Sequence, residues 1–271
     1  MVIKSLEGIS LNDIVDCLVS SFEGYFVPLP SEVSFWEQRF KAARVDLSLS
    51  FGVFEQGTLV AFIVHGIDTN DGLKTAFNSG TGVLQKYRGQ AIVDKMYAFA
   101  LPKLKKHGIQ KCKLEVIDKN IRAIRVYERI GFSITRRMKC YKGEPKSVGN
   151  QQLEVREVKL SEIVNKPQFP YSWDNCHEAI QLSGKSYKCY LVNELEEDNY
   201  VGSFVINPSN GYIAQLEAKS KNLEALLTAV TEIAASIKIN NIDDRRIELI
   251  ACLDKIGMEN TIDQFEMEMM L

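Results

Sequence analysis

The chain has few of the residues that mark disulfide-rich or metal-binding proteins. Its 271 residues include six cysteines, three histidines and seven prolines. The cysteines have no CxxC spacing and sit mostly in apolar patterns, so we expect reduced, buried thiols and no metal site. No apolar run approaches the roughly 18 residues of a membrane span. The start of the chain lacks a charged segment followed by an apolar one, which predicts no signal peptide and a cytoplasmic location.

Neither sign of charge dominates the whole chain, but the two halves differ. The net charge is −2; residues 1–150 hold 22 basic and 15 acidic residues, and residues 151–271 hold 11 and 20. The basic excess concentrates in residues 103–142, which would favour a polyanionic ligand such as coenzyme A or a nucleic acid. Charge alone favours the simpler interpretation, a solvated surface complemented by the acidic half.

Alternating strand and helix patterns predict an α/β (α+β) protein with two domains. A stretch rich in turn residues, 143–150, reads as a linker. The pattern before it partly repeats after it: the segment Tyr127–Phe132 (YERIGF) is answered by Leu253–Met258 (LDKIGM). This repeat predicts an internal duplication, with domains at residues 1–145 and 151–271.

The segment Tyr87–Ala91 (YRGQA) opens a helical pattern that we expect to run from Gly89 to His107. The first amides of a helix have no intrahelical acceptors, and phosphates bind to them. Small residues let such a ligand approach the backbone closely. Taken alone, this segment is more typical of an ordinary turn that leads into a helix.

A second motif begins at Asn120, after the strand pattern Lys111–Ile117. Asn120 and Tyr127 are seven residues apart, about two helical turns, so they lie on nearly the same face of the predicted helix. Alone, the pair also fits a helix-capping asparagine and a buried aromatic residue.

Together, the strand Thr81–Leu84, the YRGQA turn and the helix from Asn120 to Phe132 resemble the GCN5-related N-acetyltransferases (GNAT). That family has the signature R/Q-x-x-G-x-G/A and then N-x-x-A-x-x-x-Y-x-x-x-G-F, and residues 2–142 fit its order of elements. The departures are Lys86 at the first signature position, Gln85 for a frequent proline and Val93 for a frequent glycine. None of these removes a backbone donor.

The resemblance implies that each domain has a mixed, mostly antiparallel twisted sheet flanked by helices. It also implies acetyl-CoA as co-substrate and a set of site residues. The main chain of Val83 and Leu84 would bind the pantetheine arm, and Asn120 would contact it. Tyr127 would protonate the leaving thiolate, as a phenol that is neutral at pH 7 can. The pyrophosphate would lie on the amides of Arg88, Gly89, Gln90, Ala91, Ile92 and Val93.

Glu115 is the candidate base, because an amine must lose a proton to attack the thioester. Its position five residues before Asn120 is similar to that of the base in ribosomal-protein N-terminal alanine acetyltransferases. A partner for Lys113 or Arg122, or a solvated strand residue, is the alternative. His65 reads as a core residue and His107 as a helix-end residue. Tyr25, Phe26 and Trp36 either line an acceptor pocket or pack onto the sheet.

The second half resembles a GNAT domain without its chemistry. Its counterpart of the phosphate turn, residues 218–224, has no glycine, while Leu253 answers Tyr127 and Arg246 answers Asn120. The whole pattern predicts an N-acetyltransferase for a small-molecule amine or peptide, with no nucleic-acid or membrane partner and with a homodimer left open. The alternatives are an acyl-CoA-binding regulatory protein without turnover and, less favoured, a nucleic-acid-binding module.

Overall fold

The computed structural model describes residues 1–146, 152–164, 167–195, 199–219 and 222–271. These residues form two compact units, each with residues from both halves of the chain. Unit 1 comprises Met1–Val116, Asn120–Thr135 and Glu266–Leu271; unit 2 comprises Ile117–Lys119 and Arg136–Phe265. The boundaries 1–145 and 151–271 stay predictions for independent domains. Residues 147–150 of the predicted linker lie outside the described residues.

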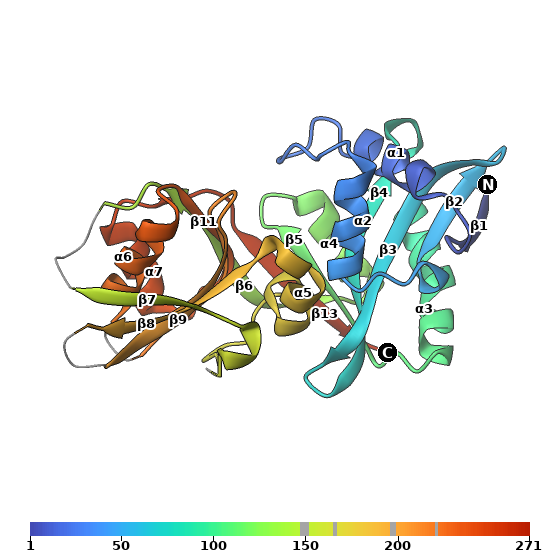
Figure 1. The fold of residues 1–271 in the computed structure, drawn as a ribbon. Coiled ribbons are helices and arrows are strands. Elements are labelled where there is room, and N and C mark those ends of the chain that lie inside the picture. Colours follow the sequence, from blue (N-terminus) through green and yellow to red (C-terminus); the bar gives the residue numbers. More distant parts are fainter. Residues whose placement is uncertain (147–151, 165–166, 196–198, 220–221) are drawn as a thin grey trace. The chain divides into compact units, whose positions relative to one another are not determined.

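Unit 1 is built on an open sheet in which β4 and β5 are parallel and the pairs from β1 to β4 are antiparallel (Figure 1). The strand order is β1-β2-β3-β4-β5-β13. The bounds are β1 Val2–Ser5, β2 Phe51–Glu55, β3 Thr58–Asn70, β4 Leu73–Val83, β5 Lys111–Ile117 and β13 Gln264–Met270. The first residues of β6, Ser133–Gly143, also belong to this unit.

Helices cover both faces of this sheet. On one face, α1 (Leu11–Ser21) and α2 (Val33–Ala42) pack on Phe62 and Val64 of β3. On the other face, α3 (Ile92–Lys106) and α4 (Ile121–Ile130) meet through the rings of Tyr97 and Tyr127. Short 3₁₀ turns lie at η1 Leu47–Leu49 and η2 Gln85–Tyr87.

Local signals fix the ends of these helices. The Ser10 hydroxyl accepts the Asp13 amide at 3.1 Å and caps α1. The predicted start of α3 at Gly89 is wrong, because Gly89 and Ala91 both have positive φ and the helix begins at Ile92. The predicted helix from Asn120 to Ile130 is confirmed, with Asn120 as its N-cap and Gly131 as its left-handed C-cap.

Unit 2 repeats this order of elements. Its sheet runs β6-β11-β10-β9-β8-β7, with β12 beside β6 and a parallel pair at β10–β11. One face packs against α6 and α7, and the other against α5. The bounds are β7 Leu153–Val158, η3 Leu160–Glu162, η4 Trp173–Asn175, α5 His177–Leu182, η5 Gly184–Ser186, β8 Lys188–Glu194, β9 Tyr200–Asn207, β10 Tyr212–Ala218, α6 Leu223–Ile233, β11 Ile237–Asp243, α7 Ile247–Lys255 and β12 Glu259–Asn260.

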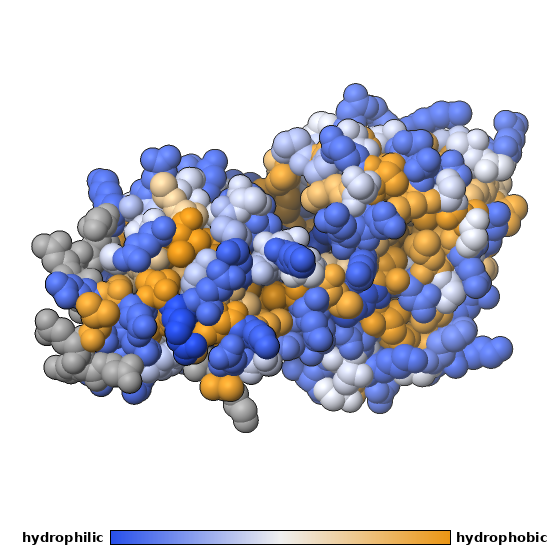
Figure 2. All heavy atoms as spheres, in the orientation of Figure 1, coloured by the Kyte–Doolittle hydropathy of each residue, from blue (hydrophilic) through white to orange (hydrophobic). Residues whose placement is uncertain are grey.

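The mixed, mostly antiparallel sheets flanked by helices confirm the predicted fold class. All six cysteines are free, and only Cys176 is not buried. Hydrophilic side chains cover much of the surface in Figure 2, with hydrophobic ones between them. Among the helices that the structure describes, none has the length and apolar character to span a membrane.

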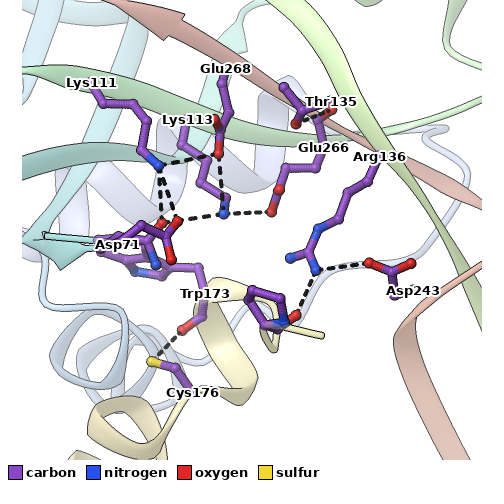
Figure 3. Close-up of polar contacts among 12 residues, drawn as sticks. Asp71, Lys111, Lys113, Thr135, Arg136, Trp173, Cys176, Asp243, Glu266 and Glu268 are labelled. Atoms are coloured by element: carbon purple, nitrogen blue, oxygen red, sulfur yellow. Dashed lines mark hydrogen bonds and ion pairs between the residues drawn. The ribbon is translucent and has the colours of Figure 1, made fainter. Parts of the chain in front are cut away.

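The C-terminal strand β13 lies beside β5 in unit 1, and buried ion pairs join the two strands (Figure 3). Lys113 Nζ lies 2.7 Å from Glu266 Oε2 and 3.5 Å from Glu268 Oε1. Lys111 Nζ lies 3.4 Å from both Glu268 and Asp71. Alternation along a strand puts both lysines on one face, where they meet the similarly spaced glutamates.

Candidate functional site

The site begins where β4 and β5 stop pairing. The parallel pairs run from Thr75–Lys111 to Asn78–Leu114, although β4 continues to Val83. The register against β3 shifts between Val64 and His65, which leaves Ser79 as an extra residue in β4. Such a β-bulge bends a strand and increases its twist, and here it coincides with the last paired residue, Asn78.

The two predicted main-chain contacts lie on different edges of β4. The Leu84 amide donates to the Val60 carbonyl at 3.0 Å, so it is turned towards β3. Successive residues alternate, which turns Val83 towards the other edge. The Val83 carbonyl accepts Arg88 Nε at 3.1 Å. An extended ligand added to this edge would therefore meet Val83, whereas the Leu84 amide already has a partner.

The phosphate-type turn has two left-handed residues. Gly89 has φ of 76° and Ala91 has φ of 53°, and these are the G and G/A positions of the signature. A positive φ is uncommon for alanine and is a form of strain found at functional sites. Because the Lys95 amide donates to Ala91 O, the amides of Ile92, Val93 and Asp94 precede the first hydrogen bond of α3 and have no acceptor within the helix.

Side chains around the turn hold it to the rest of unit 1. Arg88 donates through Nη2 to Ser21 O at 2.8 Å, and its own amide donates to Gln85 O at 3.2 Å. The Tyr87 hydroxyl donates to the Glu55 carboxylate. Of the predicted phosphate-binding amides, Arg88 is thus the one already paired.

A negative charge stands near the start of α3. Asp94 pairs with Arg129 of α4 through two contacts of 2.7 and 2.8 Å. The hydrogen bond from Arg129 lowers the pKa of Asp94. Arg129 thereby offsets a charge that would otherwise repel a bound phosphate.

Tyr127 lies in a buried cluster with residues of β4 and α3. Its ring contacts Tyr97 edge-on at 6.3 Å, and its hydroxyl accepts Asn78 Nδ2 at 3.4 Å. Burial raises the pKa of Tyr127 above its usual 10, so the phenol keeps its proton at neutral pH. Sequence reasoning missed Asn78 and Tyr97. The available signal for Asn78 was an amide side chain directly after the apolar residues Ala76 and Phe77 of a strand.

Asn120 joins the start of α4 to the loop after α1. Its Oδ1 accepts the Ala123 amide at 3.2 Å, and its Nδ2 donates to the Tyr25 hydroxyl at 3.1 Å. Burial raises the pKa of Tyr25. Phe26 beside it is 50% exposed, whereas Trp36 is buried and donates to Pro30 O at 2.8 Å. Trp36 therefore packs in the core, the second of the two roles predicted for it.

Glu115 is the first residue of β5 beyond the segment that pairs with β4, and it is half-buried. Lys113, one of its predicted alternative partners, pairs with Glu266 and Glu268. No metal-binding group of three or more His, Cys, Asp or Glu occurs in the described part of the chain.

His65 is a core residue, and we expect it to make unit 1 sensitive to acid. Its ring is buried, and Nδ1 lies 2.7 Å from Leu49 O. Burial lowers its pKa from 6.5 to about 4. The unfolded chain binds a proton below about pH 6.5 while the folded protein does not, so protons favour unfolding. Stability should fall as the pH drops from 6.5 towards 4, by about 3 kcal/mol in total.

Urea unfolding at neutral pH and at about pH 5 measures this effect. Trp36 lies in unit 1 and Trp173 in unit 2, so a Trp173→Phe background reports unit 1 alone. His65→Gln should reduce the loss at acid pH, and exposed His107→Gln should leave it unchanged. An equal loss with and without His65 would contradict the prediction.

In unit 2, side chains of the protein occupy the edge of β10 that corresponds to the open edge of β4 at Val83. Arg246, just before α7, donates through Nη2 to Leu216 O of β10 at 2.7 Å. The Leu216 amide donates to the Tyr171 hydroxyl at 3.2 Å, and that hydroxyl donates to Glu217. Both backbone groups of Leu216 are thus paired, and Leu253, at the position of Tyr127, is fully buried. Ser220 and Lys221 of the predicted turn counterpart lie outside the described residues.

Comparison with known proteins agrees with this geometry. The sequence model of the Acetyltransferase (GNAT) family matches residues 11–132, and this part of the chain belongs to that family. Comparison with curated proteins finds no significant match.

Solved structures extend the likeness to the whole chain, which has a tandem GNAT fold. A tandem GNAT protein of the clavulanic acid biosynthesis pathway is 13% identical, with a TM-score of 0.62 over 99% of this chain and 98% of that one. A GCN5-related N-acetyltransferase from Sphaerobacter thermophilus is 10% identical, with a TM-score of 0.68 over 99% and 95%. A candidate acetyltransferase of Pyrococcus horikoshii is 15% identical, with a TM-score of 0.68 over 100% and 89%.

Proposed function

We propose that the protein is an acetyl-CoA-dependent N-acetyltransferase, with an active domain at residues 1–145 and a degenerate one at 151–271. The observation that carries the proposal is that three features occur together in unit 1. These are the open edge of β4 at Val83, the left-handed turn that leads into α3, and the buried phenol of Tyr127. The free thiols accord with a reducing, cytoplasmic location.

In this proposal the chain's own groups bind and orient acetyl-CoA as a substrate. The arm adds to β4 at Val83 as an extra strand, and Asn120 contacts it. The pyrophosphate lies on the amides from Gly89 to Val93, where the helix dipole favours negative charge. The amides of Leu84 and Arg88 are already paired within the protein, so these two residues help to hold the strand end and the turn in place rather than donate to the ligand.

The chemical step is direct attack by a primary amine on the thioester carbonyl. Glu115 accepts the proton that the amine loses, directly or through water. The C–N bond forms, the C–S bond breaks, and Tyr127 gives its proton to the departing thiolate. Glu115 and Tyr127 then regain their starting protonation states by exchange with solvent. The acceptor is a small-molecule amine or a peptide.

Calorimetric titration with acetyl-CoA tests the binding site. We expect about one site per chain, because side chains fill the corresponding edge of unit 2. Gly89→Val should weaken binding at least about tenfold, because a β-branched residue resists positive φ and would reshape the turn. Gly108→Val is the matched control. It has φ of 78° and open surroundings like Gly89, but lies beyond the other end of α3.

Release of CoA in the presence of a panel of amines tests turnover. Binding with release establishes a transferase. Binding without release from any amine would favour a regulatory acyl-CoA-binding protein, and equal loss of binding in both glycine variants would remove the turn from the site.

A further inference from the structure

A cluster of hydrogen-bonding groups meets the hydroxyl of Tyr127 from the inside of unit 1. Asn78 Nδ2 lies 2.7 Å from Thr81 Oγ1, 2.9 Å from the Tyr97 hydroxyl and 3.4 Å from the Tyr127 hydroxyl. Asn78, Tyr97 and Tyr127 are each at least nine-tenths buried. Three oxygens of different elements therefore converge on one side-chain amide.

The backbone fixes the direction of that amide. Asn78 Oδ1 accepts the Gly80 amide at 3.0 Å, across the β-bulge at Ser79. Because a backbone N–H can bond only to the oxygen end of the side chain, the NH₂ end must face the hydroxyls. Asn78 is also the last β4 residue paired with β5. The bulge thus aims the amide at Tyr127.

The number of available hydrogens determines which groups donate hydrogen bonds to the Tyr127 hydroxyl. The amide has two hydrogens: one faces Thr81 at 2.7 Å, and the other is shared between the hydroxyls of Tyr97 and Tyr127 at 2.9 and 3.4 Å. Thr81 receives one of them and can turn its own hydroxyl hydrogen to Tyr127. Hydrogen bonds from Thr81 and Asn78 oppose the rise that burial causes in the pKa of Tyr127. Both groups therefore stabilise the phenolate over the neutral phenol.

We propose that Asn78 and Thr81 are positioning residues for Tyr127, holding donors at its oxygen so that the hydroxyl hydrogen points outward and the resulting phenolate is stabilised. This rests on the proposed function, in which Tyr127 gives its proton to a thiolate. A buried phenolate without donors would carry the full desolvation cost of an unpaired charge. The two donors lower that cost at the moment when the proton leaves.

Three near-isosteric variants test the role. Asn78→Asp keeps an oxygen for the Gly80 amide but loses the NH₂ donors and adds a charge. Thr81→Val removes only the hydroxyl, and Thr81→Ser restores it. We expect kcat to fall about tenfold in the first two, with KM for acetyl-CoA within about twofold of wild type. The alkaline limb of kcat should move to higher pH, since an acid with weaker phenolate stabilisation ionises later.

A readout without turnover separates this inference from the proposed function. In protein labelled with fluorotyrosine, ¹⁹F NMR follows each phenol, and Tyr127→Phe identifies the Tyr127 signal. Its titration midpoint should rise in Asn78→Asp and Thr81→Val and return in Thr81→Ser. Unchanged midpoints in both variants would overturn the inference. A wild-type protein without CoA release would instead count against the proposed function, while the titration would still test these contacts.

Discussion

Replacing Tyr127 by phenylalanine is expected to lower kcat by about 10²- to 10⁴-fold, the range typical of a lost general acid. The ring contacts with Tyr97 and Phe132 stay available to phenylalanine, so the fold and the affinity for acetyl-CoA should change little. Steady-state kinetics with calorimetry measures the two effects separately. Tyr190→Phe is the control, since it removes the hydroxyl of another buried tyrosine, in unit 2.

An unchanged kcat in Tyr127→Phe would remove the phenol from the acid role. A parallel loss of kcat and acetyl-CoA affinity would instead indicate that the hydroxyl binds the substrate in its ground state. We expect kcat and acetyl-CoA affinity to respond separately because the two groups lie apart. The Tyr127 hydroxyl contacts Asn78 of β4, while the groups proposed to hold the pyrophosphate lie on the turn before α3.

Unit 2 shows what the same fold looks like with these groups replaced. Leu253 supplies a fully buried aliphatic side chain where unit 1 has a phenol. Arg246 and Tyr171 pair with the backbone of Leu216 on β10. An added substrate arm would have to displace these contacts and leave the partly buried carboxylate of Glu217 without its charged partner, Arg246. The internal side chains thus favour a structural role for this edge.

Features determined by neighbouring residues could be predicted from the sequence. Asn120 caps α4, Gly131 ends it, and β5 spans Lys111–Ile117 as its alternation indicated. Each of these features depends on contacts within a few residues along the chain. Asn120 and Tyr127, two turns apart in the predicted helix, bond to different elements, Asn120 to Tyr25 and Tyr127 to Asn78.

Features that depend on distant partners could not be read in this way. The start of α3 was misplaced because the dihedral angles of Ala91 depend on the whole turn. The ion-pair partners of Lys111 and Lys113 could not be predicted, since Glu268 and Glu266 lie more than 150 residues away along the chain. Asn78 gave no local sign of its three hydroxyl neighbours, which come from α3, α4 and its own strand.

The buried ion pair between β5 and β13 leads to the largest predicted change in stability. The side chains of Lys113 and Glu266 are 4% and 5% exposed. Lys113→Met leaves Glu266 buried without its closest cation, and we expect unit 1 to lose about 3–5 kcal/mol of unfolding free energy. The urea midpoint of Trp36 fluorescence in a Trp173→Phe background measures this for unit 1.

The double variant Lys113→Met/Glu266→Met should recover most of the loss, because two apolar side chains remove both desolvation costs. Lys188→Met is the control, since its ion pair with Glu157 is exposed and should not affect the midpoint. A double variant no more stable than Lys113→Met would show that the loss comes from packing rather than from the uncompensated charge. Recovery would establish that the loss in Lys113→Met comes from the uncompensated charge of Glu266, at the contact of β13 with β5, the strand that also carries Glu115.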